Sequence, residues 1–81
     1  MEERIKKVVC ETLKIDESAF SVELAAGDIA EWDSLGHVAL LQAVESDFGI
    51  VFDVGDAIDI ESVEDLIVMV RKYTAQTVSD A

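Results

Sequence analysis

The chain lacks the covalent and metal cross-links that hold many very small domains together. Its 81 residues contain no proline, one cysteine and one histidine. A single thiol excludes an internal disulfide, and one cysteine with one histidine cannot supply a structural zinc site. The fold must therefore rest on an apolar core. With 51% hydrophobic residues, the chain has enough apolar material for one small domain.

Long hydrophobic runs are also missing. The N-terminus begins Met1-Glu2-Glu3-Arg4 and has no apolar segment of the kind found in secretory signals. Apolar runs such as residues 38–41 and 67–70 are far too short to cross a bilayer. A lone thiol is typical of a reducing compartment. We therefore expect a cytoplasmic, monomeric protein without membrane contact.

Positive charge is absent from most of the chain. The net charge is −12, and residues 15–70 contain no lysine or arginine. Nucleic acids are bound through basic side chains, so this composition predicts no nucleic-acid partner. An acidic surface attracts basic protein surfaces and speeds encounter with them, although acidity can equally serve solubility alone.

Apolar periodicity predicts an all-α fold, a small four-helix bundle of three main helices and one short helix. We expect helices over residues 2–13, 34–48, 53–58 and 62–73. Gly49 is placed to end the second helix, and Ser62 followed by Asp65 resembles a capping box at the start of the last.

The segments between these helices carry further expectations. A long loop at residues 14–33 holds scattered apolar side chains that should pin it to the bundle, with a short helical turn within 21–26. Residues 50–52 favour a strand by propensity but have no partner strand, so we expect a buried connection. The folded domain should cover residues 1–74, and residues 75–81 should form a disordered tail.

Ser34 stands where the second helix begins, in the run Trp32-Asp33-Ser34-Leu35-Gly36-His37. Unpaired N–H groups and the helix dipole favour anions at this end, so a phosphate ester on the Ser34 hydroxyl would be well placed. We expect Gly36 to leave space beside Ser34 for a large group. Asp and Ser are both good N-cap residues, so an ordinary helix start is the alternative interpretation.

Together, these motifs resemble those of the acyl carrier proteins of fatty acid and polyketide biosynthesis. The resemblance covers residues 2–73. It rests on the first helix, on Asp33-Ser34-Leu35 after a long loop, on Phe48-Gly49-Ile50 followed by Phe52-Asp53, and on Ser62-Val63-Glu64-Asp65-Leu66.

The resemblance implies a specific function. A phosphopantetheinyl transferase would move 4′-phosphopantetheine from coenzyme A to Ser34, and the thiol of this arm would hold an acyl group as a thioester. The protein itself would catalyse nothing and would serve acyl-loading and acyl-transferring biosynthetic enzymes. Asp33 and Leu35 would help the transferase to recognise the site, and Trp32, His37 and Glu45 are further candidates for contact with partner enzymes.

Two departures from the family pattern favour a specialised pathway over housekeeping fatty-acid synthesis. Trp32 replaces the usual small residue, and acidic residues are missing from the start of the second helix, where Gly36, His37 and Ala39 stand. Such patterns are typical of polyketide, cell-envelope and aminoacyl carriers. Trp32 itself could equally pack the loop against the core or contact a partner.

Two other classes of function compete with the carrier. One is an unmodified acidic helical interaction module of the same shape. The other is a small hydrolase using Ser34 and His37, although no third residue is evident to orient the imidazole. Cys10 is expected to be a half-buried packing residue. The acidic segment 53–64 lacks calcium ligands at the required positions, so we expect no metal site.

Overall fold

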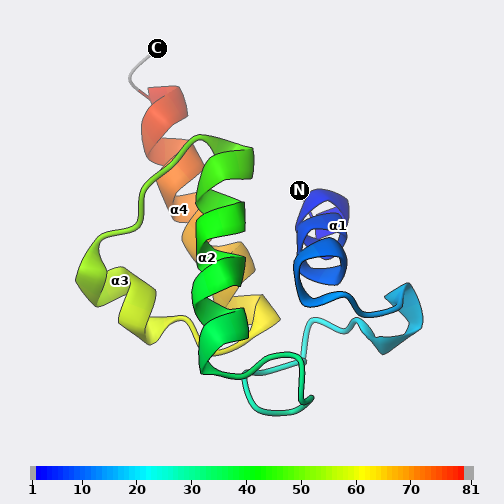
Figure 1. Cartoon of the computed structure of the whole chain (residues 1–81). Helices are drawn as coiled ribbons and strands as arrows, with labels where there is room; N and C mark the ends of the chain where they lie inside the picture. The colour runs from blue at the N-terminus through cyan, green and yellow to red at the C-terminus, as the bar shows by residue number, and fades with distance from the viewer. Residues whose placement is uncertain (1, 80–81) are drawn as a thin grey trace.

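The computed structural model describes the backbone of residues 2–79 and the side chains of residues 2–74. Figure 1 shows the helices α1 and α3 on opposite sides of α2. The elements are α1 (Glu2–Leu13), a 3₁₀ turn η1 (Glu17–Ala19), α2 (Ser34–Phe48), α3 (Val54–Asp59) and α4 (Val63–Ser79). Within this part of the chain the only β-pairing is an isolated bridge between Ala25 and Ser62. The predicted all-α bundle with one short helix is confirmed.

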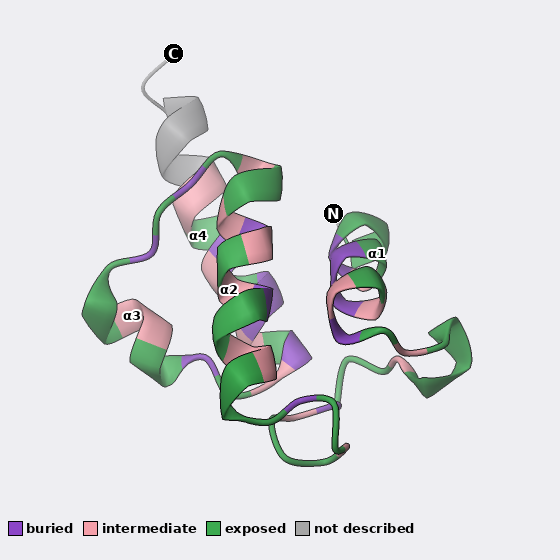
Figure 2. Ribbon diagram, in the orientation of Figure 1, coloured by how far each residue is buried: buried purple, intermediate pink, exposed green. Residues whose placement is uncertain are grey.

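One apolar core joins the helices, and the buried residues lie on their inward faces (Figure 2). The burial of each large aliphatic side chain contributes about 1.5–3 kcal/mol. The fully buried side chains are Trp32, Ile5, Leu40, Ile60, Leu66, Val9, Val44, Val63 and Val70. In the described part of the chain, every buried polar side-chain atom has a hydrogen-bond partner.

The long loop is pinned to the start of α4, as predicted. The N–H of Val63 donates to the Leu24 carbonyl at 2.9 Å, and the N–H of Glu64 donates to the Val22 carbonyl at 3.1 Å. These loop carbonyls satisfy N–H groups that have no acceptor within α4. Within residues 21–26, the N–H of Leu24 donates to the Ser21 carbonyl at 3.0 Å, so a single hydrogen-bonded turn lies where the short helical turn was predicted, but no helix is formed there. The short helix of the long loop is η1, whose N-cap is Asp16.

The predicted ends of the helices are confirmed where caps define them. Gly49 follows α2 in a left-handed conformation, and its N–H donates to the Glu45 carbonyl. At the start of α4, Ser62 Oγ accepts from the N–H of Asp65, whose carboxylate accepts from the N–H of Glu61. The first bond is that of a capping box, whereas the return bond comes from Glu61, one residue before Ser62.

The connection at residues 50–52 agrees with its prediction, whereas the end of α4 does not. Residues 50–52 form a connection in which Ile50 and Phe52 are buried, as expected. The helix α4 continues to Ser79 and is longer than the predicted end at residue 73. Part of the proposed tail therefore has helical backbone, and residues 80–81 lie outside the described residues. The domain boundary at residue 74 stays a prediction.

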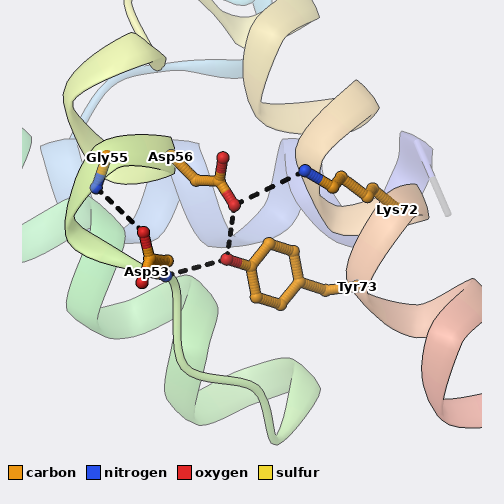
Figure 3. Close-up of polar contacts among 5 residues, drawn as sticks. All are labelled: Asp53, Gly55, Asp56, Lys72 and Tyr73. Carbon is orange, nitrogen blue, oxygen red and sulfur yellow. Dashed lines mark hydrogen bonds and ion pairs between the residues drawn. The ribbon is translucent and has the colours of Figure 1, made fainter.

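The short helix α3 is held to α4 through Tyr73 (Figure 3). The Tyr73 hydroxyl donates to Asp56 Oδ2 at 2.6 Å and accepts from the Asp53 N–H at 2.8 Å. The ammonium group of Lys72 lies 3.6 Å from the same Asp56 oxygen, and the Tyr73 ring meets Phe52 edge to face. These contacts fix α3 where its far end borders the candidate site.

Candidate functional site

Asp33 is the residue that caps α2. Its backbone is extended, and its Oδ1 accepts a hydrogen bond from the Gly36 N–H at 2.8 Å. Ser34 is consequently the first residue of the helix and not its cap. The sequence left both residues as candidate caps, and the structure assigns this role to the carboxylate. The serine hydroxyl is thereby left for other chemistry.

Ser34 presents this hydroxyl on the surface. The residue is exposed, and no side chain or backbone group in the described part of the chain hydrogen-bonds to its hydroxyl. The N–H groups of Ser34 and Leu35 lie in the first helical turn, where the helix supplies no acceptor. An anionic ester at this position would meet the positive end of the helix dipole without steric hindrance.

The expected role of Gly36 is wrong. Its missing side chain does not make room for a large group on Ser34, because that space is filled by the chain itself. A β-carbon on Gly36 would collide with the Glu31 carbonyl oxygen, and it would lie 3.3 Å from both Asp33 Oδ1 and a methyl group of Leu13. The glycine lets the loop approach the first turn of α2, which places Asp33 where it can cap the helix.

Trp32 is completely buried, with 0% of its surface exposed. Of the two roles left open for it, packing of the loop is the one observed. A direct contact with a partner enzyme is wrong, because an inaccessible indole cannot reach another protein. Its Nε1–H donates a hydrogen bond to Nδ1 of His37 at 2.9 Å, and the two rings are nearly parallel, with centroids 6.1 Å apart.

A surface pocket lies beside Ser34. It is bordered by the loop, by the first turn of α2 and by the chain between α3 and α4. Its lining residues are Ala26, Gly27, Trp32, Asp33, Ser34, His37, Ile58, Ile60 and Glu61. The walls carry two carboxylates, from Asp33 and Glu61, and no lysine or arginine. The structure therefore brings His37 to the same pocket as Ser34, as its spacing predicts.

The remaining candidates for partner recognition differ in accessibility. Leu35 is 81% exposed and lies next to Ser34. Glu45 is half-buried, and its carboxylate accepts from the Phe52 N–H at 2.8 Å. Because Glu45 lies eleven residues along the helix from Ser34, the two are about 16 Å apart. Glu45 stabilises the connection at residues 50–52, and its proposed contact with partners stays a prediction.

Exposed apolar residues on α3 were missed in the sequence. Val54 is 74% exposed and Ile58 is 71% exposed, while Ala57 packs against the core. Their spacing of four residues could have indicated a shared face of a helix. The signal was weak because a six-residue helix shows little periodicity.

The described residues give little support to a metal site, a membrane-spanning helix or a reactive thiol. No group of three or more His, Cys, Asp or Glu side chains there could hold a metal ion, and no helix there is long and apolar enough to span a membrane. Cys10 is half-buried on α1, as expected. Burial, reinforced by the charge of Glu17, raises the pKa of its thiol, which lowers its reactivity.

Comparisons with known proteins agree on one family. Residues 3–70 match the family described as "Phosphopantetheine attachment site". The acyl carrier protein of Petrotoga mobilis is 31% identical over 65 residues, which cover 80% of this chain and 76% of that protein. The solution structure of the holo acyl carrier protein from Geobacter metallireducens is similar with a TM-score of 0.86 at 26% identity. That similarity covers 99% of this chain and 92% of that one.

Proposed function

The chain belongs to the phosphopantetheine-attachment family of acyl carrier proteins, and we propose that Ser34 is the residue that carries its arm. The cofactor of the family is covalently attached 4′-phosphopantetheine, whose terminal thiol holds acyl groups as thioesters. The observation that carries the assignment is the exposed Ser34 hydroxyl, which has no hydrogen-bond partner among the described residues and begins α2 beside an open pocket.

The chain's own residues prepare this position. Asp33 holds the first turn of α2 together, which keeps the N–H groups of Ser34 and Leu35 directed at the place where a phosphate on Ser34 would lie. Gly36 allows the close approach of the loop that this cap needs. These features support a phosphate ester on Ser34, although no lysine or arginine lies near it in the sequence.

We further propose that the carrier serves a specialised pathway and is recognised through apolar contacts. Leu35 is 81% exposed and Val38 is 53% exposed on α2, so two exposed apolar side chains lie within one turn of Ser34. Family membership implies interaction with a phosphopantetheinyl transferase and with biosynthetic enzymes. An acyl cargo and an aminoacyl cargo are both compatible with this surface, and the cytoplasmic location and the monomeric state remain predictions.

A hydrolase using Ser34 and His37 is disfavoured by the orientation of the imidazole. In a catalytic triad a carboxylate accepts from Nδ1–H and orients the ring. Here Nδ1 is itself the acceptor, because the Trp32 N–H donates to it. We therefore propose that the protein catalyses no ester hydrolysis, and we expect no turnover of thioesters by the purified protein alone. A rate abolished by His37→Ala would contradict this.

The attachment site is tested by intact mass after incubation with coenzyme A, Mg²⁺ and a broad-specificity phosphopantetheinyl transferase. We expect the mass of one arm to be gained on the peptide that contains Ser34, and no gain in Ser34→Ala. The matched control is Ser46→Ala, because Ser46 is also an exposed serine on α2. Modification retained in Ser34→Ala would overturn the assignment, and a folded wild-type protein without any gain would favour the unmodified interaction module.

Recognition by the transferase is tested with Leu35→Ser. We expect slower modification with unchanged folding, because the variant removes an exposed apolar side chain next to the acceptor hydroxyl. Val68→Ser is the control, since Val68 is 59% exposed on α4. Rates of modification measured at low and high salt separate the two modes of docking. A strong decrease with salt would indicate that the acidic surface steers association.

A further inference from the structure

The pocket beside Ser34 has an unusual charge balance. Residues 15–70 contain no lysine or arginine, and Asp33 and Glu61 both line the pocket. A phosphodiester on Ser34 would add a further negative charge there. His37 is the one residue in the pocket wall whose side chain can donate N–H groups from a basic ring. It lies three residues after Ser34, which places both side chains on neighbouring parts of the helix surface.

Trp32 determines which nitrogen of His37 carries the proton. An indole N–H can only donate, so Nδ1 of His37 must offer its lone pair to form the observed 2.9 Å bond. The neutral ring then has its proton on Nε2. A protonated ring has no acceptor atom and cannot keep this bond. Because Trp32 is buried and fixed, it holds the imidazole in one orientation and one tautomer.

The Nε2–H group is left available at the pocket. No described residue hydrogen-bonds to Nε2, and no buried polar side-chain atom in this part of the chain lacks a partner. The Nε2 atom is therefore accessible to solvent. Side chains on an α-helix incline toward its N-terminus, so the ring extends from His37 toward the turn that holds Ser34.

We propose that His37, held by Trp32 as the Nε2–H tautomer, donates a hydrogen bond to the phosphate of the arm on Ser34. This inference rests on the proposed attachment at Ser34. His37 would then be a positioning residue for the phosphate of the arm. It gives the phosphate a neutral donor where a lysine is absent, in addition to the N–H groups of the first turn of α2. This role explains why an indole lies buried two residues before the attachment serine.

The test uses the fully loaded protein and two signals that depend on the phosphate and the ring. Intact mass first establishes that Ser34 is loaded, so a failure of the attachment site is detected separately. Ring ¹⁵N shifts then report the tautomer of His37, and ³¹P shifts report the phosphodiester. We expect the Nε2–H tautomer at neutral pH. We also expect a ³¹P shift at neutral pH that depends on the His37 ring.

Variants distinguish positioning from packing alone. His37→Phe keeps a ring but has no N–H, and Trp32→Phe keeps an aromatic core but cannot fix the tautomer. We expect both to displace the ³¹P resonance at neutral pH. His37→Gln places an amide N–H near the position of Nε2 and should restore much of the wild-type shift.

Glu61, a carboxylate that lines the same pocket, provides the control. Glu61→Gln removes a charge from the pocket but leaves the Trp32–His37 hydrogen bond in place, so the Nε2–H tautomer should remain. The proposal is overturned if His37 of loaded wild-type protein does not carry its proton on Nε2, or if loaded His37→Phe reproduces the wild-type ³¹P shift. The tautomer measurement needs no variant, so the test holds even if one variant fails to fold.

Discussion

Lys14 and Gly49 adopt the same left-handed backbone conformation, with φ of 59° and 67°, one residue beyond the ends of α1 and α2. In each case the following residue closes the helix end. Ile15 N–H donates to the Cys10 carbonyl and Ile50 N–H donates to the Glu45 carbonyl, both at 3.0 Å. These are the long-range bonds of a Schellman motif. The same end is thus built once with glycine and once with lysine.

Lys14→Gly should stabilise the protein by up to about 1 kcal/mol, because a left-handed conformation is unfavourable for a residue with a β-carbon. The free energy of unfolding in urea measures the effect. Gly49→Ala is the matched control and should destabilise by a similar amount, since it introduces a β-carbon at the equivalent position. Equal signs for the two variants would contradict the comparison.

Gly36→Ala should destabilise the protein by about 1–3 kcal/mol, because its β-carbon would overlap the Glu31 carbonyl oxygen and force the loop away from α2. Gly55→Ala provides the contrast. There the nearest atom to a β-carbon is Asp53 Oδ2 at 3.5 Å, so the change should be neutral or stabilising by up to about 1 kcal/mol. Urea unfolding of both variants decides between close packing at Gly36 and general helix propensity, which predicts gains at both positions.

Asp33→Ala should cost about 1 kcal/mol, since it removes the acceptor for the Gly36 N–H. Asp33→Asn makes the same change in charge but keeps a side-chain oxygen that can cap α2, so it should remain close to the wild type in stability. The difference between the two variants in thermal or urea unfolding therefore isolates the cap. If the two variants are equally unstable, the charge of Asp33 and not its hydrogen bond is what stabilises α2.

Ionisation of Tyr73 should lower the stability of the protein in alkaline solution. The Asp53 N–H that donates to the phenol lowers the pKa of Tyr73, but the bond to Asp56, burial and the charges of both aspartates raise it, and the net result is a raised pKa. The folded state is therefore more stable when the phenol of Tyr73 is neutral. This contribution is complete below the ordinary pKa of about 10 and is lost as the pH rises through the folded-state value.

Tyr73→Phe provides the measurement, because it removes this titration and keeps the ring against Phe52. As the pH rises above about 10, the free energy of unfolding in urea should fall more steeply for the wild type than for the variant. Lys6, whose pKa is raised by its hydrogen bond to Glu17, titrates in both proteins and cancels in the comparison. Parallel pH courses would show that the phenol does not stabilise α3 in this way.

Local features of the sequence were sufficient to predict the helices, several of their caps and the family of this protein. Apolar spacing predicted the helices, because each buries a stripe that repeats with the helical period. Gly49 and the Ser62–Asp65 box marked helix ends through bonds that span only a few residues. The position of Asp33-Ser34-Leu35 after a long loop indicated the carrier family, which the comparisons show.

The tertiary structure decided what depends on contacts between separate segments. The burial of Trp32, the close approach of the Glu31 carbonyl to Gly36 and the pairing of residues 22–26 with residues 61–64 all arise from how the loop folds back. The tautomer of His37 likewise follows from a hydrogen bond to that loop. The sequence by itself determined the helices, the ends marked by Gly49 and Ser62, and the family, because these follow from local spacing. Side-chain roles around Ser34 required the fold, because packing brings together residues whose spacing carries no signal of contact.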